Sequence, residues 1–202
     1  MPDTSTSPTR SAFLDLKDER QLVEEGFEFL DEKRMILAQE MLKRLRDYEA
    51  ALDRHRELHD AASAALATAV GRHGLDGLEI YPAGRRDDAR HSLYHSRFLG
   101  VDLVDGTFEP GERPQLPEVV NPSPEARRCR EAFEALLVAA VEIAVMRASL
   151  IRLVKEYVRT ERRARALENV ILPEIEENLS FMEEQLEAMD QEEAVRVRNA
   201  AR

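Results

Sequence analysis

The chain of 202 residues has no tryptophan, a single cysteine and only 5% aromatic residues. So few large aromatic side chains would supply the core of a sizeable globular domain poorly. Cys129 alone cannot form an internal disulfide, which fits a reducing compartment. The longest apolar run, 135–141, is far shorter than the roughly 20 residues that span a membrane. We therefore expect neither a disulfide-stabilised domain nor a direct membrane span.

An excess of basic charge is also missing. The net charge is −11, which argues against nucleic acid as a partner of the chain as a whole. Charged residues nevertheless make up 34% of the chain, and much of the remainder is Ala and Leu. A composition of this kind is typical of long helices and coiled coils.

The first long segment is free of helix-breaking residues. Between Gly26 and Gly71 there is neither Gly nor Pro, and apolar residues recur alternately every three and four positions. Ten of the thirteen positions of this seam are apolar: Phe27, Leu30, Arg34, Leu37, Met41, Arg44, Tyr48, Ala51, His55, Leu58, Ala62, Ala65 and Ala69. The pattern predicts a helix over residues 11–70 that packs along another helix. Residues 1–10 are expected to be a flexible N-terminus.

The last long segment opens with a capping signal, because Ser123 can cap a helix whose first residue is Pro124. We predict a helix over residues 123–198, kinked near Pro173, which lacks a backbone donor, and then a flexible tail over 199–202. Its seam is predicted first at Phe133, Leu137, Ala140, Ala144, Arg147, Ile151, Val154 and Val158. After a polar interval at Glu161, Arg165 and Glu168, it is predicted to resume at Leu172, Ile175, Leu179, Met182, Leu186 and Met189.

Residues 71–122 differ from both helices, since they hold most of the glycines and five of the nine prolines. Residues 78–81 could form a short strand, and residues 85–90 a charged loop. Residues 98–104 and 107–108 are predicted to form a β-hairpin that turns at Asp105–Gly106. The fold class that follows is a long antiparallel two-helix coiled coil with a small insert between the helices, over 71–122, that contains a β-hairpin.

Two pairs of histidines have helical i, i+4 spacing, His55 with His59 and His91 with His95. Such pairs can bind zinc, but no carboxylate or cysteine cluster completes a site, and no Glu directly follows His55 as in a zinc protease. The segment GRHGLDG lacks the spacing and the Lys of a phosphate-binding loop. We therefore expect no metal, no cofactor and no catalytic residues.

Acidic charge is concentrated in two stretches. Residues 15–34 carry a net charge of −4, and residues 168–195 contain ten acidic residues and no Lys or Arg. In an antiparallel hairpin these stretches would lie side by side, and like charges packed together reduce stability. A solvated face, a partner or a salty environment could each explain them.

Both ends of the chain resemble the D subunit, the central rotor shaft, of V-type and archaeal-type rotary ATPases. The opening SPTRSAFLDLKDERQLVEEGFEFLDEKR is similar to the start of that family at Pro8, Thr9, Arg10, Leu14, Leu16, Gly26, Leu30, Lys33 and Arg34. A second family signature is matched by Arg162, Arg163, Ala166, Leu167, Glu168, the run 170–172 and Pro173, and its acidic-then-basic ending by Asp190, Glu192, Glu193, Arg196 and Arg198. The chain departs from the family at Met35, Arg165, Ala194 and Val195.

The resemblance implies a non-catalytic central stalk (rotor) protein that transmits torque between the catalytic A and B subunits and a membrane ring that moves ions. It implies the F subunit of the stalk and a membrane-side socket protein as further partners, and a cytoplasmic location peripheral to the membrane. Residues 147–165 would contact the stalk, and residues 10–35 and 170–198 would form the bearing. The partner-binding residues would be Arg10, Gly26, Lys33, Arg34, Arg162, Arg163, Arg165, Glu168, Pro173, Arg196 and Arg198.

Two other functions fit a two-helix coiled coil. One is a stalk component of a secretion ATPase, and the other is a structural adaptor that does not rotate. Co-purification separates them, because a rotor brings the A and B subunits with it and an adaptor does not.

Overall fold

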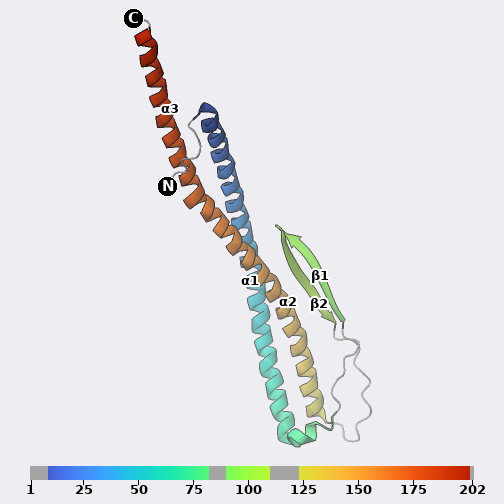
Figure 1. Ribbon diagram of the computed structural model, residues 1–202. Coiled ribbons are helices and arrows are strands. Elements are labelled where there is room, and N and C mark those ends of the chain that lie inside the picture. Colours follow the sequence, from blue (N-terminus) through green and yellow to red (C-terminus); the bar gives the residue numbers. More distant parts are fainter. Residues whose placement is uncertain (1–8, 82–89, 110–122, 201–202) are drawn as a thin grey trace. The chain divides into compact units, whose positions relative to one another are not determined.

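The computed structural model describes residues 9–81, 90–109 and 123–200. The elements follow in the order α1 (Arg10–Leu78), β1 (Arg90–Phe98), β2 (Val101–Glu109), α2 (Pro124–Ala166), a π-helical turn η1 (Leu167–Ile171) and α3 (Leu172–Ala200) (Figure 1). The predicted fold class is confirmed: two long antiparallel helical segments enclose a two-stranded hairpin in the sequence. Residues 1–8 of the predicted flexible N-terminus (1–10), most of the predicted charged loop 85–90 and residues 201–202 of the predicted tail (199–202) lie outside the described residues.

The chain divides into two compact units, which we describe separately. The terminal unit comprises residues 1–37 and 157–202, and the central unit comprises residues 38–156. The helix α1 contributes to both units, whereas the hairpin belongs to the central unit alone.

The predicted seam of α1 is confirmed, because all thirteen of its positions are buried or half-buried. Leu37, Ala62 and Ala69 are completely buried. The same spacing continues toward the start of the helix through half-buried Phe13, Leu16, Arg20 and Val23. From Phe13 to Ala69, α1 therefore follows an uninterrupted heptad pattern.

The first part of the predicted α2 seam is wrong by one residue. Phe133, Leu137, Ile151 and Val154 are 42–44% exposed, whereas Leu153 is fully buried. The seam that faces inward is Leu136, Ala139, Ile143, Met146, Leu150, Leu153, Tyr157, Thr160, Ala164 and Leu167. The polar interval predicted at Glu161, Arg165 and Glu168 is also wrong by one residue. Thr160, Ala164 and Leu167 face inward instead, so no charged residue occupies the seam there. The second part of the prediction is confirmed as far as Leu186, and Ile175 and Met182 are buried; Met189, at the end of that stretch, is 55% exposed.

The predicted irregularity near Pro173 takes the form of the π-helical turn. The backbone N–H of Leu172 donates to the carbonyl of Leu167, five residues earlier instead of four. Because Pro173 has no N–H and its ring crowds the preceding turn, a widened turn before it is physically reasonable. The extra residue in this turn also shifts the inward-facing seam, which passes from Leu167 to Leu172 in one step of five.

The hairpin turns at a different place from the prediction. Leu99 and Gly100, both with positive φ (47° and 85°), form its two-residue turn, and Phe98 pairs with Val101. Asp105 and Gly106 instead lie inside β2. A turn at Leu99 allows nine residues of each strand to pair, whereas a turn at Asp105–Gly106 would leave little strand on its far side.

Gly106 is required for close approach and not for a turn. A Cβ atom at this position would lie 2.8 Å from Leu93 Cδ2 and 3.1 Å from the carbonyl oxygen of Ser92, both on the paired strand. Only glycine fits such a position without displacing β1.

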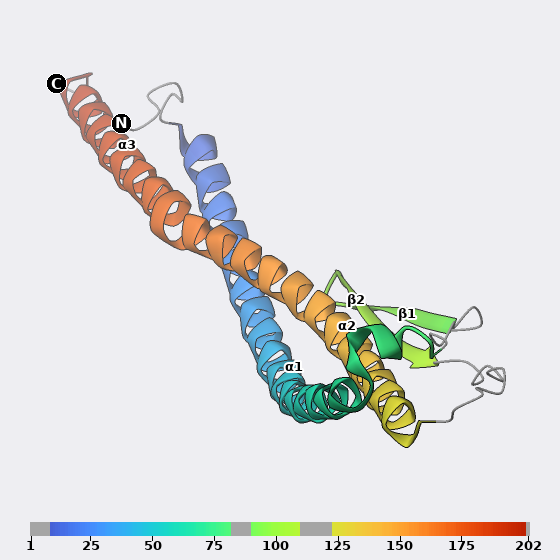
Figure 2. The same cartoon turned by 90° about the horizontal axis from the view of Figure 1, so that it is seen from below.

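The hairpin packs on α2 through its second strand, as both ribbon views show (Figures 1 and 2). Val101, Leu103 and Val104 are buried, and Ser149 of α2 is completely buried beneath them. The Ser149 hydroxyl donates to the Val104 carbonyl at 2.6 Å and accepts from the Val104 N–H at 2.9 Å. This serine therefore satisfies the backbone N–H and carbonyl of Val104 on the outer edge of β2, which would otherwise be unpaired there.

The end of α1 is turned back by a glycine. Gly74 has φ 71° and ψ 167°, a conformation that only glycine adopts readily, and it interrupts the helix shortly before Leu78. The predicted short strand over 78–81 is wrong, because the Tyr81 N–H donates to the Leu78 carbonyl in a turn. His73 Nε2 lies 2.6 Å from the hydroxyl of Ser123, which caps α2 by accepting from the Ala126 N–H.

Candidate functional site

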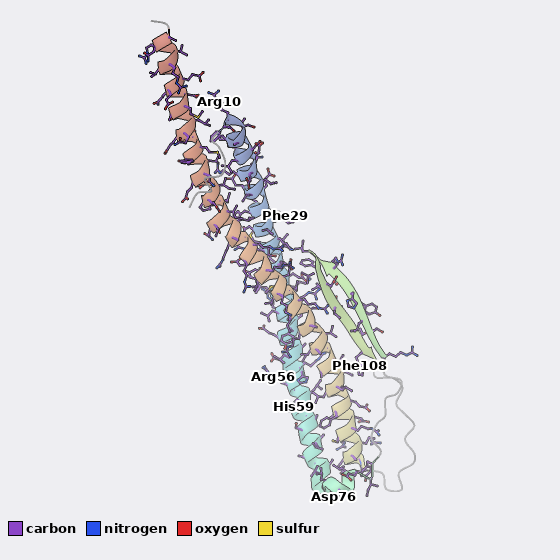
Figure 3. All side chains as sticks on the ribbon, viewed as in Figure 1. Arg10, Phe29, Arg56, His59, Asp76 and Phe108 are labelled. Atoms are coloured by element: carbon purple, nitrogen blue, oxygen red, sulfur yellow. The ribbon has the colours of Figure 1, made fainter. Side chains whose placement is uncertain are left out.

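Arginines of α1 reach across to acidic residues of the opposite helix throughout the terminal unit. The pairs are Arg10 with Asp190 at 2.8 and 3.0 Å, Arg20 with Glu176 at 3.1 Å, and Arg34 with Glu161 at 2.7 Å. Figure 3 labels Arg10 at the start of α1, next to α3. Two of these contacts, at Glu176 and Asp190, fall within the acidic stretch 168–195 and offset a small part of its charge.

The pair of Arg34 with Glu161 lies at the centre of a small network. Arg34 also contacts Asp31 at 2.5 Å, and Arg165 contacts the second oxygen of Glu161 at 2.7 Å. The hydrogen bond from Arg34 lowers the pKa of Glu161 below its ordinary value, and the charge of Arg165 acts in the same direction. Because the Glu161 side chain is only 17% exposed, this is the best shielded of the three cross-helix pairs.

A hollow of about 750 Å³ lies between the start of α1 and the last turns of α3. Its lining includes Arg10, Met189, Asp190 and Arg196. Two of the predicted partner-binding residues, Arg10 and Arg196, therefore line one surface, where Arg196 also pairs with Glu192 at 3.5 Å. Arg198 is exposed nearby in sequence but does not line the hollow.

The remaining predicted residues are spread along the terminal unit. Gly26 faces Leu167, since a Cβ at Gly26 would lie 3.7 Å from Leu167 Cδ1. Lys33 is half-buried; Arg162, Arg163, Glu168 and Pro173 are exposed. The structure thus gathers Gly26, Arg34 and Arg165 near the π-helical turn and Arg10 and Arg196 at the hollow, and forms no single site from all of them.

Sequence reasoning missed an exposed apolar face on α2. We call Phe133, Leu137, Ile151 and Val154 the outer stripe. They recur at heptad spacing within the central unit, and each is more than 40% exposed while the adjacent seam is buried. The described residues therefore leave a little under half of each of these side chains open to solvent. These residues were part of the seam predicted from the sequence, but that seam was expected to pack against α1 and not to face outward.

The histidine pairs do not make a metal site in the described part of the chain. No group of three or more His, Cys, Asp or Glu side chains there could hold a metal ion. The expectation that His91 and His95 share a helix is wrong, because both belong to strand β1. Four strand residues span about 13 Å, which is too far for two ligands of one ion.

Taken together, these observations describe two helical units, each built on an antiparallel pair of helical segments, with a β-hairpin packed on α2 in the central unit. Of the described helices, not one has a stretch long and apolar enough to cross a bilayer. A family model for the D subunit of ATP synthase matches residues 12–202, and the chain belongs to this family.

Relatives span nearly the whole chain. It is 24% identical over 194 residues to the D subunit of the V-type ATP synthase of Thermotoga neapolitana, covering 96% of both proteins. It is 30% identical over 207 residues to the D subunit of the A-type ATP synthase of Pyrococcus furiosus, covering 98% of this chain and 94% of the relative. The corresponding A-type protein of Thermococcus gammatolerans is 28% identical over 200 residues, which are 96% of this chain and 92% of the relative.

Proposed function

We propose that this chain is the central stalk component of a V/A-type ATPase or ATP synthase and transmits torque between the catalytic A and B subunits and the membrane ring. The match to the D-subunit family along nearly the whole chain carries this proposal. In this role the chain is a non-catalytic, peripheral part of a membrane-bound complex at the cytoplasmic face.

The outer stripe supports a second partner along the central unit. One apolar seam of α2 is already used against α1, so a further stripe at the same spacing is suited to another protein surface. Exposed Arg147, Arg152 and Arg159 lie close to it in sequence, within the stretch 147–165 that we assign to stalk contacts. We therefore assign the outer stripe to the F subunit of the stalk.

The terminal unit supports the bearing role. Its α3 is acidic, and beyond Met182 only Leu186 is even half-buried. The bearing in this proposal consists of residues 10–35 and 170–198, inside the ring of A and B subunits. We assign the membrane-side socket protein to the end of the central unit that contains Gly74 and the contact of His73 with Ser123.

A double charge substitution tests the stalk assignment. Ile151→Glu with Val154→Glu places two carboxylates on the outer stripe and should weaken binding of the purified F subunit at least tenfold in a titration. The matched control is Leu42→Glu, which changes a 57% exposed leucine of α1 in the same unit and should bind normally. Circular dichroism establishes that both variants keep their helix content. Equal binding by both would contradict the assignment of the F subunit to this face.

Purification of the native complex tests the function itself. A tagged chain should bring the A, B and F subunits with it. If it brings a partner but neither A nor B, the chain is an adaptor and the rotor proposal is wrong.

A further inference from the structure

Gly26 of α1 and the π-helical turn of the opposite helix lie at the same level of the terminal unit. The contact is direct, because a Cβ added to Gly26 would meet Leu167, the first residue of the turn, at 3.7 Å. Each feature weakens the helix that contains it. Glycine inside a helix is unfavourable relative to alanine, and a π turn replaces the ordinary hydrogen-bond ladder.

Packing does not require glycine at this position. A separation of 3.7 Å is ordinary van der Waals contact, and the φ angle of Gly26 is not positive. Alanine would therefore fit against Leu167 without a shift of either helix. Glycine therefore weakens α1 at position 26 although the structure has space for alanine there.

Pairing with α1 does not require the extra residue of the π turn either. The ion pairs of Arg20 with Glu176 and Arg34 with Glu161 flank the turn; they are 14 residues apart on α1 and 15 apart on the other side. The seam of α1 is regular there, whereas the opposite seam steps by five from Leu167 to Leu172. A helix with one residue fewer would follow α1 without interruption.

The turn itself is weakly held. It contains no buried residue, and Val170 is 59% exposed. The Asn169 side chain donates to the Arg165 carbonyl at 3.1 Å at the entry to the turn. Pro173, two residues beyond it, can donate no backbone hydrogen bond.

We propose that Gly26 and the turn Leu167–Ile171 together form a joint within the terminal unit. At this joint, α3 and residues 10–25 of α1 move relative to the rest of their own helices, residues 157–166 and 27–37. The joint is a property of the chain and is testable even if the shaft function is wrong. Elements of low local stability are those that move or rearrange on binding. Under the proposed function, the joint would lie within the bearing, because Gly26 belongs to the stretch 10–35 and the turn overlaps the start of the stretch 170–198.

Hydrogen exchange of the isolated chain tests the joint. Amides of 167–171 should exchange faster than those of 157–164. Gly26→Ala should slow exchange at 167–171 about fivefold, because alanine stabilises the facing helix by the amount that glycine costs. The matched control is Gly71→Ala, since a Cβ at Gly71 meets nothing within 4 Å and the residue lies in the central unit. Gly71→Ala should leave exchange at 167–171 unchanged.

Two outcomes overturn the joint. One is equal protection of 167–171 and 157–164 in the unaltered chain. The other is the same exchange at 167–171 in the Gly26→Ala and Gly71→Ala variants. Neither outcome depends on rotation, so a failure here is distinct from a failure to co-purify with A and B subunits.

Single-residue deletions test whether pairing needs the extra residue. Both are made in a Pro173→Ala background, so that proline contributes equally. Deletion of Val170 should leave the Tm equal to that of the background or higher, because the seams then match. Deletion of exposed Glu177 should lower it by at least about 5 °C, because it displaces buried Met182 from the seam. Equal losses from both deletions would show that the π turn is required for pairing.

Discussion

The central and terminal units use the same kind of paired helices but differ in how completely the second helix is covered. In the central unit α2 is buried on one side by α1 and on another by the hairpin, where Ser149 and Leu153 are fully buried. Among the described residues of the terminal unit, α3 has α1 alone beside it, and residues 187–200 are all exposed. The comparison indicates that local stability is lower in α3 of the terminal unit than in α2 of the central unit.

The largest expected effect is a loss of stability that should differ between buried residues of the central unit and of the terminal unit. Leu153→Ala removes a fully buried side chain from the covered part of α2 and should reduce the free energy of unfolding by about 2–5 kcal/mol. Met182→Ala, at a site 8% exposed on α3, should reduce it less and mainly increase fraying of α3. Urea unfolding measured with hydrogen exchange distinguishes global from local loss. A larger global loss for Met182→Ala would reverse the comparison.

The closed end of the central unit depends on one glycine. Gly74→Ala forces a side chain into φ 71°, ψ 167° and should cost about 1–3 kcal/mol. Thermal unfolding should therefore show a lower Tm for Gly74→Ala, while Gly71→Ala, in a regular helical position of the same helix, should raise it. A Tm unchanged by Gly74→Ala would mean that the break in α1 is not needed to close this end.

The hairpin is expected to detach when its hydrogen bonds to α2 are removed. Ser149→Ala leaves the buried N–H and carbonyl of Val104 without the hydroxyl that pairs with both, and should cost about 1–3 kcal/mol. Exchange should accelerate in 101–104 and not in 157–200. Acceleration throughout α3 instead would show that the two units are not independent in stability.

The smallest effect concerns pH in the terminal unit. The pKa of Glu161 is lowered from 4.5 by Arg34, so the ionised carboxylate is favoured in the folded state. The resulting stability is present above pH 4.5 and is lost as the pH falls through the lower, folded pKa. Glu161→Gln should abolish this part of the acid dependence, as measured by Tm in acidic buffers on both sides of that pKa. An identical Tm profile for both proteins would exclude the ion pair as its cause.

The fold was accessible from the sequence because Gly and Pro are absent between Gly26 and Gly71 and the seam of α1 is uninterrupted. Which face of α2 packs inward could not be predicted from the sequence, because the outer stripe is more apolar than the buried residues Ala139, Ser149 and Thr160. A prediction based on apolarity alone therefore selected the face that is more exposed to solvent. The same spacing, counted from Phe133, is one residue off before the π turn but correct from Leu172 onward. The extra residue of the turn brings the inward-facing positions back into the predicted register.

Other errors share a physical cause: local signals were assigned the wrong purpose. Asp105–Gly106 has the chemistry of a tight turn, but Gly106 is small because β1 crosses it closely, and Leu99–Gly100 forms the turn. The pairing of Arg34 with Glu161 and of Arg10 with Asp190 joins residues more than 120 positions apart. No local pattern specifies such partners, which become visible only once the helices are paired.

Truncation after Asn169 separates a torque-transmitting shaft from a passive scaffold, because it removes Pro173 and α3 but leaves the central unit intact. We measure binding of the F subunit, ATP hydrolysis and ion pumping in the reconstituted complex with the unaltered and the truncated chain. The truncated chain should bind the F subunit normally, while ATP hydrolysis is no longer matched to ion pumping. Full coupling without α3 would contradict the bearing role of the terminal unit, and loss of F-subunit binding would contradict its placement on the central unit.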